Sequence, residues 1–254
     1  MAHVSYSEIK LWHECPRKHK LQYIDKIDGF KGNLHTAFGT AMHSVCEHGL
    51  LDENLDRGKH FLEEFEKEVA SLKVKEVEIQ PDLYEQMVGQ YGPIVSSFRD
   101  ELDNYFEDCE VVSTEEKLYE DMEGHDLKFK GFIDLVVKTK DGKYHILDWK
   151  TTSWGWNARR KADKITNYQL TLYKVFWAKK HGVPLDMVET HFGLLKRTAK
   201  KNNTEIFRVT SGPTKVKNAL TFLEKAVINI KRKLVIKNRL SCKGCAFYKT
   251  VHCT

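Results

Sequence analysis

Several features are absent from this 254-residue sequence, and each absence narrows its class. No apolar run approaches the roughly 20 residues that a helix needs to cross a bilayer, and residues 1–5 lack the basic and apolar regions of a secretory signal. No internal repeat, low-complexity tract or long linker interrupts the chain. We therefore expect an intracellular, cytoplasmic protein that makes no membrane contact and is not a repeat array.

The composition is that of an ordinary globular protein, with 41% hydrophobic and 30% charged residues. This supplies enough apolar side chains for a sizeable core, and residues 1–254 are expected to form one elaborated domain. The net charge of +5 is modest, but the basic residues concentrate in the carboxyl half, which favours a polyanionic partner. Six cysteines in a reducing compartment seldom form disulfides, so their spacing is tested against metal or cluster binding.

The chain divides into three parts with different patterns. Residues 1–109 are mainly helical, and the first helix is expected to begin in the capping-box sequence Ser5-Tyr6-Ser7-Glu8 and to end before Pro16. Residues 110–210 contain three consecutive antiparallel strands, then a helix and two more strands. Residues 211–254 contain a helix and a cysteine-bearing tail. The pattern predicts an α/β (α+β) fold with a sheet flanked by helices.

Two acids and a lysine lie in strands that are otherwise apolar. Asp148 and Lys150 are two residues apart, so their side chains leave the same face of a strand, and Asp134 lies on the preceding strand. Carboxylates can hold a divalent metal, and a neighbouring lysine can orient or deprotonate the attacking water or neutralise a pentavalent phosphate. An Asp-x-Lys pattern is common by chance on solvated faces. Here the apolar context makes an unpaired charge costly, which favours metal-dependent phosphodiester cleavage.

The two acids share a face only if the turn between their strands has a suitable length. A two-residue loop at Asp141-Gly142 would set Leu135 opposite Asp148, and Asp134 would then face the wrong way. We therefore predict a register slip of one residue, through a three-residue loop or a bulge near residues 139–143.

A third carboxylate is expected on the strand before Asp134. Glu116 has the phase of Val112 and Leu118, which are taken as inward residues. Glu116 is therefore preferred to Glu115, although the sequence does not decide between them.

Five motifs follow one another along the chain. They are Ser5-Tyr6-Ser7 with Cys15-Pro16, Lys18 and Tyr23; Gly39-Thr40-Ala41-Met42-His43; Gly131-Phe132-Ile133-Asp134; Asp148-Trp149-Lys150; and Gln169-Leu170-Thr171-Leu172-Tyr173. In this order, over nearly the whole chain, they resemble the PD-(D/E)XK nuclease superfamily, and in particular its RecB-like and Cas4-like exonuclease branch. One departure is the Thr-Thr-Ser-Trp after Lys150, where the branch commonly has Thr-Gly.

The resemblance implies a restriction-endonuclease-like mixed sheet flanked by helices, dependence on Mg²⁺ or Mn²⁺, and digestion of DNA ends. It implies that His43, Asp134 and Asp148 bind the metal. Glu116 would support these ligands, and Lys150 would act on the nucleophilic water or the transition state. Without the motif around it, His43 would be taken for an ordinary core or boundary histidine of an amphipathic helix.

Gln169 and Tyr173 lie one helical turn apart and share a face. They can simply pack and hydrogen-bond within the fold. In the context of the resemblance, Gln169 is expected to position Lys150 or a phosphate, and Tyr173 to contact the DNA backbone.

Three cysteines gather in the short C-terminal tail as Cys242-Lys243-Gly244-Cys245 and Cys253, which is ligand spacing. The resemblance places a distant cysteine, here Cys15, with them as the fourth ligand of a [4Fe-4S] cluster that clasps the two chain ends. Four thiolates suit Zn²⁺ equally, with His252 as a substitute ligand. The two cysteines that lack such spacing and are expected in the core are Cys46 and Cys109.

Aromatic and basic residues alternate directly after Lys150. Rings that stack on bases and cations that meet phosphates suit single-stranded DNA. The predicted DNA-binding residues here are Trp154, Trp156, Arg159, Arg160 and Lys161. Two further basic clusters, each as easily a solvated face, are Lys196, Arg197, Lys200 and Lys201, and Lys231, Arg232, Lys233, Lys237 and Arg239.

The function expected from the sequence is a Mg²⁺- or Mn²⁺-dependent DNA exonuclease that acts on single strands or DNA ends in recombination, repair or DNA processing. One alternative is a non-catalytic DNA-binding or scaffolding protein on the same fold, although every acid and the lysine are present. Another is a structure-specific endonuclease. Digestion polarity, preference for DNA over RNA, oligomeric state and pathway are left open by the sequence.

Overall fold

The computed structural model describes residues 3–253, which fall into two compact units. Three segments make up unit 1: Met1–Phe30, Lys117–Gly131 and Gly212–Thr254. Two segments make up unit 2: Lys31–Glu116 and Phe132–Ser211. Strands β2 (Glu110–Asp121) and β3 (Lys128–Lys138) each run from one unit into the other. That residues 1–254 form a single nuclease domain stays a prediction.

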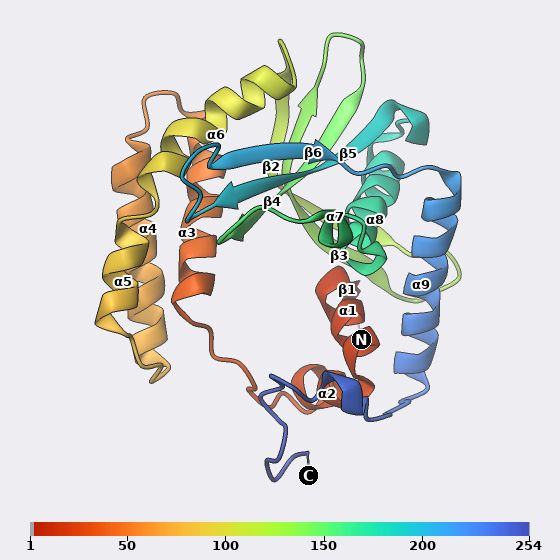
Figure 1. Ribbon diagram of the computed structural model, residues 1–254. Coiled ribbons are helices and arrows are strands. Elements are labelled where there is room, and N and C mark those ends of the chain that lie inside the picture. Colours follow the sequence, from red (N-terminus) through yellow and green to blue (C-terminus); the bar gives the residue numbers. More distant parts are fainter. Residues whose placement is uncertain (1–2, 254) are drawn as a thin grey trace. The chain divides into compact units, whose positions relative to one another are not determined.

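Unit 1 is built largely from the two ends of the chain (Figure 1). Helix α1 begins after Ser5, whose side chain accepts a hydrogen bond from the backbone of Glu8, and it ends before Pro16, as predicted. Helix α9 contacts α1. The helices and the short strand of this unit are β1 (His3–Ser5), α1 (Tyr6–Glu14), α2 (Pro16–His19), a π-helical turn (Lys20–Ile24), α9 (Pro213–Lys231) and a 3-10 turn (Arg239–Ser241).

Unit 2 begins with helices that bury one apolar face each. Its helices are α3 (Leu34–Leu51), α4 (Arg57–Val74), α5 (Pro81–Val88), α6 (Gly92–Tyr105), α7 (Ala158–Lys161), α8 (Lys164–His181) and a 3-10 turn (Leu185–Met187). Helix α3 starts with a capping box, in which Asn33 and Thr36 exchange side-chain and backbone hydrogen bonds. Within residues 3–253, no helix has the length and apolar content needed to cross a bilayer.

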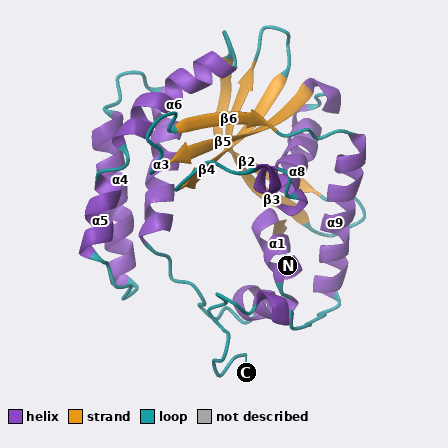
Figure 2. Cartoon of the chain, in the orientation of Figure 1, coloured by secondary structure: helices purple, strands orange, loops and turns teal. Residues whose placement is uncertain are grey.

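The sheet is mixed, as predicted (Figure 2). Its remaining strands are β4 (Tyr144–Thr152), β5 (Val188–Lys196) and β6 (Thr204–Arg208). The order is β1-β3-β4-β5-β6, and β2 pairs with β3. Strand β4 runs antiparallel to β3 and parallel to β5, and the crossover from β4 to β5 contains α8. This is the arrangement expected of a restriction-endonuclease-like fold.

Alternation along β4 gives its two faces different neighbours. Leu147 and Trp149 belong to the core formed with the buried faces of α3, α4 and α6. Asp148, between them, faces α8, where Gln169 donates a hydrogen bond to it. The core side chains thus fix the direction of Asp148.

The hairpin between β3 and β4 has the register that the two acids need. Leu135 pairs with Leu147, and not with the residue after it. The turn is wider than two residues: Thr139 N donates to Lys143 O at 3.0 Å, and Gly142 adopts a left-handed conformation at φ +83°. The predicted slip of one residue is therefore confirmed, and its physical cause is the three-residue loop closed by glycine.

Gly193 on β5 allows close packing against β4. It pairs with Trp149 in the parallel ladder, and a Cβ on Gly193 would lie 2.2 Å from the Trp149 ring.

We expect Gly193→Ala to lower the free energy of unfolding by about 1–3 kcal/mol, because the indole must move within a packed core. Urea denaturation measures this change. Gly92→Ala is the control: its Cβ would meet no atom within 4 Å, so equal destabilisation by both variants would contradict the packing argument.

Candidate active site

The site begins where the β3–β4 ladder ends. Backbone pairing between the strands runs from Lys138 and Tyr144 as far as Leu135 and Leu147. Beyond this pair, the carboxylate of Asp134 accepts a hydrogen bond from the Trp149 backbone N–H at 2.7 Å. The Asp134 side chain thus takes the place of a backbone carbonyl as the acceptor for this N–H. The bond holds Asp134 beside β4, the strand that carries Asp148.

Helix α3 brings a histidine to this acid. His43 Nδ1 lies 3.4 Å from Asp134 Oδ2. One turn earlier, a Cβ on Gly39 would lie 3.2 Å from Thr151 Oγ1, so glycine lets the helix run close to β4. This close approach explains physically why glycine precedes the histidine by four residues.

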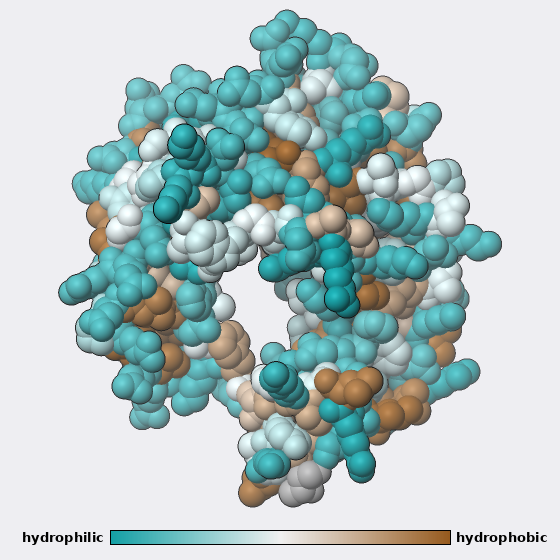
Figure 3. Space-filling model, viewed as in Figure 1, coloured by the Kyte–Doolittle hydropathy of each residue, from teal (hydrophilic) through white to brown (hydrophobic). Residues whose placement is uncertain are grey.

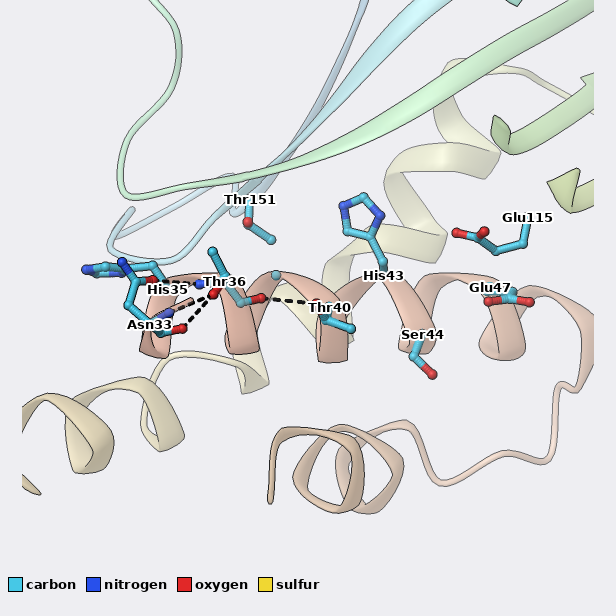
Figure 4. Close-up of a pocket in the computed structure, with 10 residues that line it drawn as sticks. Asn33, His35, Thr36, Thr40, His43, Ser44, Glu47, Glu115 and Thr151 are labelled. Atoms are coloured by element: carbon cyan, nitrogen blue, oxygen red, sulfur yellow. Dashed lines mark hydrogen bonds between the residues drawn. The ribbon is translucent and has the colours of Figure 1, made fainter. Parts of the chain in front are cut away.

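Glu115 completes a three-ligand group. One ligand atom from each of His43, Glu115 and Asp134 lies within 4.8 Å of the others. Figure 4 shows His43 and Glu115 pointing into the same groove, which Thr151 borders from β4. The groove has a volume of about 740 Å³ and also runs past polar side chains of α3, including Thr36, Thr40 and Glu47.

Asp148 lies beside this group and is held on two sides. Gln169 Nε2 donates to its Oδ1 at 2.8 Å, and the Lys150 ammonium lies 2.5 Å from its Oδ2. The Asp148 carboxylate is thus buried between an amide donor and an ammonium ion. Gln169 therefore orients Asp148, where the sequence predicted that it would position Lys150 or a phosphate.

Burial and mutual repulsion dominate the electrostatics of the acids. Burial, together with the nearby Asp134 charge, raises the pKa of Asp148 to about 6 despite the attraction of Lys150. Burial also raises the pKa of Glu115, and Asp134 adds to the effect. For Asp134 itself, burial opposes ionisation, but His43 and Lys150 outweigh it and lower the pKa. The positive charges of His43 and Lys150 thus do not fully offset the burial and mutual repulsion of the three carboxylates.

The neighbouring carboxylates stabilise the charged forms of His43 and Lys150. Burial disfavours the charged forms of His43 and Lys150, yet Asp134 raises the pKa of His43, and Asp148 raises that of Lys150. Lys150 is therefore an ammonium ion at neutral pH.

The donor set fits a divalent metal ion. Carboxylate oxygens with one imidazole suit Mg²⁺ or Mn²⁺, and the raised pKa values of Glu115 and Asp148 show that added positive charge would stabilise their ionised forms. His43, Glu115 and Asp134 are grouped closely enough to hold it together, and the charges of Asp134 and His43 act on the neighbouring Asp148.

The preference for Glu116 as third carboxylate was wrong. Its carboxylate points to α8, where Trp177 Nε1 donates at 2.9 Å, and Lys180 and His181 each lie 2.6 Å away. These bonds lower the pKa of Glu116 to about 2 although burial opposes this. The sequence argument failed because Glu115 has φ +45°, which interrupts the regular alternation of the strand.

Tyr173 does not face outward as a DNA contact requires. Its side chain is buried, and Gln169 Nε2 donates to its hydroxyl at 3.2 Å. Burial raises the pKa of the hydroxyl, so it stays neutral. Tyr173 thus supports Gln169, which in turn supports Asp148.

The loop after β4 is divided between core and surface. Trp156, predicted to stack on bases, is 7% exposed and packs against Phe192, so that prediction was wrong: the ring completes the core under β5. Trp154 is 66% exposed and remains a candidate. Arg160 lies over the Trp156 ring at 4.6 Å.

The other cations differ in how they are engaged. Arg159 is exposed, whereas Lys161 pairs with Glu205 at 2.5 Å. Lys196 pairs with the same carboxylate at 3.1 Å, and Arg197 donates to Gln90 at 2.9 Å. These three cations have structural partners.

The four predicted cluster cysteines all lie in unit 1, and its terminal segments meet around Cys15. Asn238 N donates to Cys15 Sγ at 3.4 Å, and Arg17 donates to His252 O at 2.8 Å. Among the described residues, no three cysteine sulfurs lie within 4.8 Å of one another. As expected, Cys46 is a core residue, and Cys109 packs against the core.

A sequence profile of the PD-(D/E)XK nuclease superfamily matches residues 3–250 of the chain. The chain belongs to this superfamily. Nucleases of the superfamily use divalent metals, and DNA is the substrate that membership implies. No protein of curated function matches the sequence.

A solved structure of low sequence identity shares the fold. A crystal structure of a candidate exonuclease from Eubacterium rectale is 13% identical, with a TM-score of 0.55 over 91% of this chain and 80% of that one. The structure of SSO0001, also 13% identical, aligns over 96% of this chain and 83% of its own with a TM-score of 0.45. At this identity, the first structure supports the nuclease fold and nothing finer.

The adjacent glutamates make a matched test of the site. We expect Glu116→Gln to lower the free energy of unfolding by about 1–3 kcal/mol at pH 7, because the three donors from α8 and the Ser113 hydroxyl lose a carboxylate acceptor. The stabilisation by an acid with a lowered pKa is complete above its ordinary value and disappears as the pH falls towards 2. The difference from the parent protein should therefore shrink at pH 3, as measured by urea denaturation.

Glu115→Gln is the control for this experiment. Removing a charge whose pKa is raised by burial and by Asp134 relieves repulsion, so this variant should be as stable as the parent or more so at pH 7. If Glu115→Gln were the destabilised variant, the assignment of the two side chains would be wrong.

Proposed function

We propose that this protein is a metal-dependent DNA exonuclease that acts on single strands or strand ends. The observation that carries the proposal is the convergence of His43, Glu115 and Asp134 within 4.8 Å, next to the Asp148–Lys150 pair. Support for the exonuclease mode comes from the motif resemblance and from the name of the Eubacterium rectale neighbour. Its role would lie in recombination, repair or DNA processing.

The carboxylates of Glu115, Asp134 and Asp148, together with the His43 imidazole, would hold Mg²⁺ or Mn²⁺. A divalent ion there supplies Lewis acidity to the phosphate and a more acidic bound water. Lys150 is protonated, so its role is to donate a hydrogen bond and positive charge to the phosphate or to orient the water. Water oxygen bonds to phosphorus and gives one proton to solvent, one P–O ester bond breaks, and the leaving oxygen takes up a proton from solvent.

Three contacts keep the reacting groups in place. The Trp149 backbone fixes Asp134, and Gln169 fixes Asp148. Gln169 is itself bonded to the buried Tyr173 hydroxyl. These residues act by positioning, which matters because small misplacements of catalytic groups cost large factors in rate.

A single DNA strand would lie along the groove of α3. Hydroxyl and amide side chains, including Asn33, Thr36 and Thr40, line it up to His43 and can bond phosphate oxygens. Trp154 is an exposed ring close in sequence to Lys150 and can stack on a base, with Arg159 available to a phosphate.

The cysteine tail would hold a [4Fe-4S] cluster with a structural role. Support for this proposal comes from the cysteine spacing in the tail and from the motif resemblance, and each thiolate of such a cluster would bind a different iron. Cys15, Cys242, Cys245 and Cys253 would be the ligands, joining segments that Arg17 and Asn238 already hydrogen-bond together.

The activity is tested with end-labelled single-stranded and double-stranded DNA in Mg²⁺, in Mn²⁺ and in EDTA. We expect metal-dependent shortening from ends, and a loss of at least about 100-fold in Lys150→Ala, because the variant loses transition-state charge stabilisation. Lys138→Ala, in which a cation on the neighbouring strand is removed, should keep full activity.

Other outcomes point to the alternatives. Binding of DNA without cleavage under every metal condition would indicate a scaffolding protein. Cleavage of circular single strands would indicate an endonuclease. Equal activity of Lys150→Ala and the parent would remove the proposed site.

The cluster is tested by protein purified without oxygen. We expect a brown protein with about four irons and four acid-labile sulfides per chain and no stoichiometric zinc. Cys245→Ser should lose the iron, and Cys109→Ser should retain it, because Cys109 packs against the core of unit 2. One zinc per chain and no iron would reverse the assignment.

A further inference from the structure

A second group of histidines and an acid lies away from the nuclease groove. His145 on β4 pairs in register with Glu189 on β5, and Leu147 pairs with His191. One ligand atom from each of His145, Glu189 and His191 lies within 4.8 Å of the others. Both imidazoles are buried, and the group borders a cavity of about 580 Å³ between the end of α6 and the β3–β4 hairpin. None of these residues lines the groove at His43.

The two rings face each other through one nitrogen each. His145 Nδ1 lies 3.1 Å from His191 Nε2, and Glu189 Oε2 lies 4.0 Å from His145 Nδ1. Ligand nitrogens bound to one metal at about 2.0–2.1 Å stand roughly 3.0–3.4 Å apart. The spacing of the imidazoles therefore already matches that of two ligands on a common ion.

The outer nitrogen of each ring is bonded to a hydroxyl. His145 Nε2 lies 2.9 Å from Thr139 Oγ1, and His191 Nδ1 lies 3.3 Å from the Tyr105 hydroxyl. Such outer contacts fix the ring orientation and the tautomer of metal-binding histidines. The hydroxyls come from α6 and from the hairpin loop, so three separate segments orient the two rings.

We propose that His145, His191 and Glu189 form a binding site for a first-row transition metal such as Zn²⁺, separate from the nuclease site. Coordination requires a lone pair on both facing nitrogens. Without metal, the facing N–H of one ring donates a hydrogen bond to the facing nitrogen of the other. With metal, the donating ring changes tautomer: its proton moves to its outer nitrogen, which then donates a hydrogen bond to the hydroxyl oxygen. No net proton is released, and the cavity leaves a coordination position open to water.

The surrounding charges select the kind of ion. Burial lowers the pKa of His145, and burial with His145 and Arg208 lowers that of His191 to about 3, so both rings are neutral ligands. Arg208 lies 2.9 Å and Lys143 3.4 Å from Glu189 Oε1. These two positive charges weaken the electrostatic attraction between the Glu189 carboxylate and a metal ion. Binding must then come from imidazole coordination, which favours zinc, cobalt or nickel over Mg²⁺.

Crystals of the protein grown with Zn²⁺ in excess Mg²⁺ test the proposal. We expect an anomalous zinc peak about 2.0–2.2 Å from His145 Nδ1 and His191 Nε2. Titration calorimetry should show this binding event weakened at least about tenfold in Glu189→Gln and abolished in His191→Gln. His125→Gln, in a turn of unit 1, is the control and should bind as the parent does.

The result that overturns the proposal is equally specific. Zinc peaks confined to the cysteines or the nuclease groove, with the His145–His191 hydrogen bond intact, would show that the two histidines bond to each other and do not bind metal. Unchanged zinc affinity in Glu189→Gln would do the same, and this half-buried side chain can be changed without removing a core ring. Because the readout is metal position and affinity, it does not depend on nuclease activity.

Discussion

A single hydrogen bond, from the Trp149 backbone to the Asp134 carboxylate, determines how the rest of the site is arranged. It occupies the place where β3 would otherwise continue its ladder with β4, so an acid and not a peptide group lies beside Asp148. The open end of the ladder also admits the imidazole of His43 from α3. An ionised carboxylate is a strong acceptor, and this compensates for the lost backbone pairing.

Much of this arrangement could be predicted from the sequence, because local rules govern it. The same-face requirement for Asp134 and Asp148 led to the register slip, and Gly142 provides the left-handed residue that a three-residue turn needs. The strands around the two acids followed from alternation, and the end of α1 before Pro16 followed from proline chemistry. These features depend on neighbours a few residues away, which a sequence displays directly.

The errors concern features that depend on distant packing or on a local break in regularity. Glu115 replaced Glu116 because one residue with positive φ changed the phase of β2, and glutamate gives no warning of that conformation. Trp156 has the neighbours of a DNA-binding residue, yet Phe192 on β5 buries it. The sequence does not indicate the pairing of His145 with His191, because only the parallel pairing of β4 with β5 brings them together.

The chain order of the two units has a consequence for biosynthesis. The residues of the candidate nuclease site lie between His43 and Tyr173, and they belong to unit 2. Unit 1 needs contacts across almost the whole chain, such as the bond from Arg17 to His252, 235 residues away. Because chains fold as they emerge, unit 2 can fold on the ribosome while unit 1 must wait for the last residues. A translation arrest near residue 211 would therefore release a chain that already carries every proposed catalytic group.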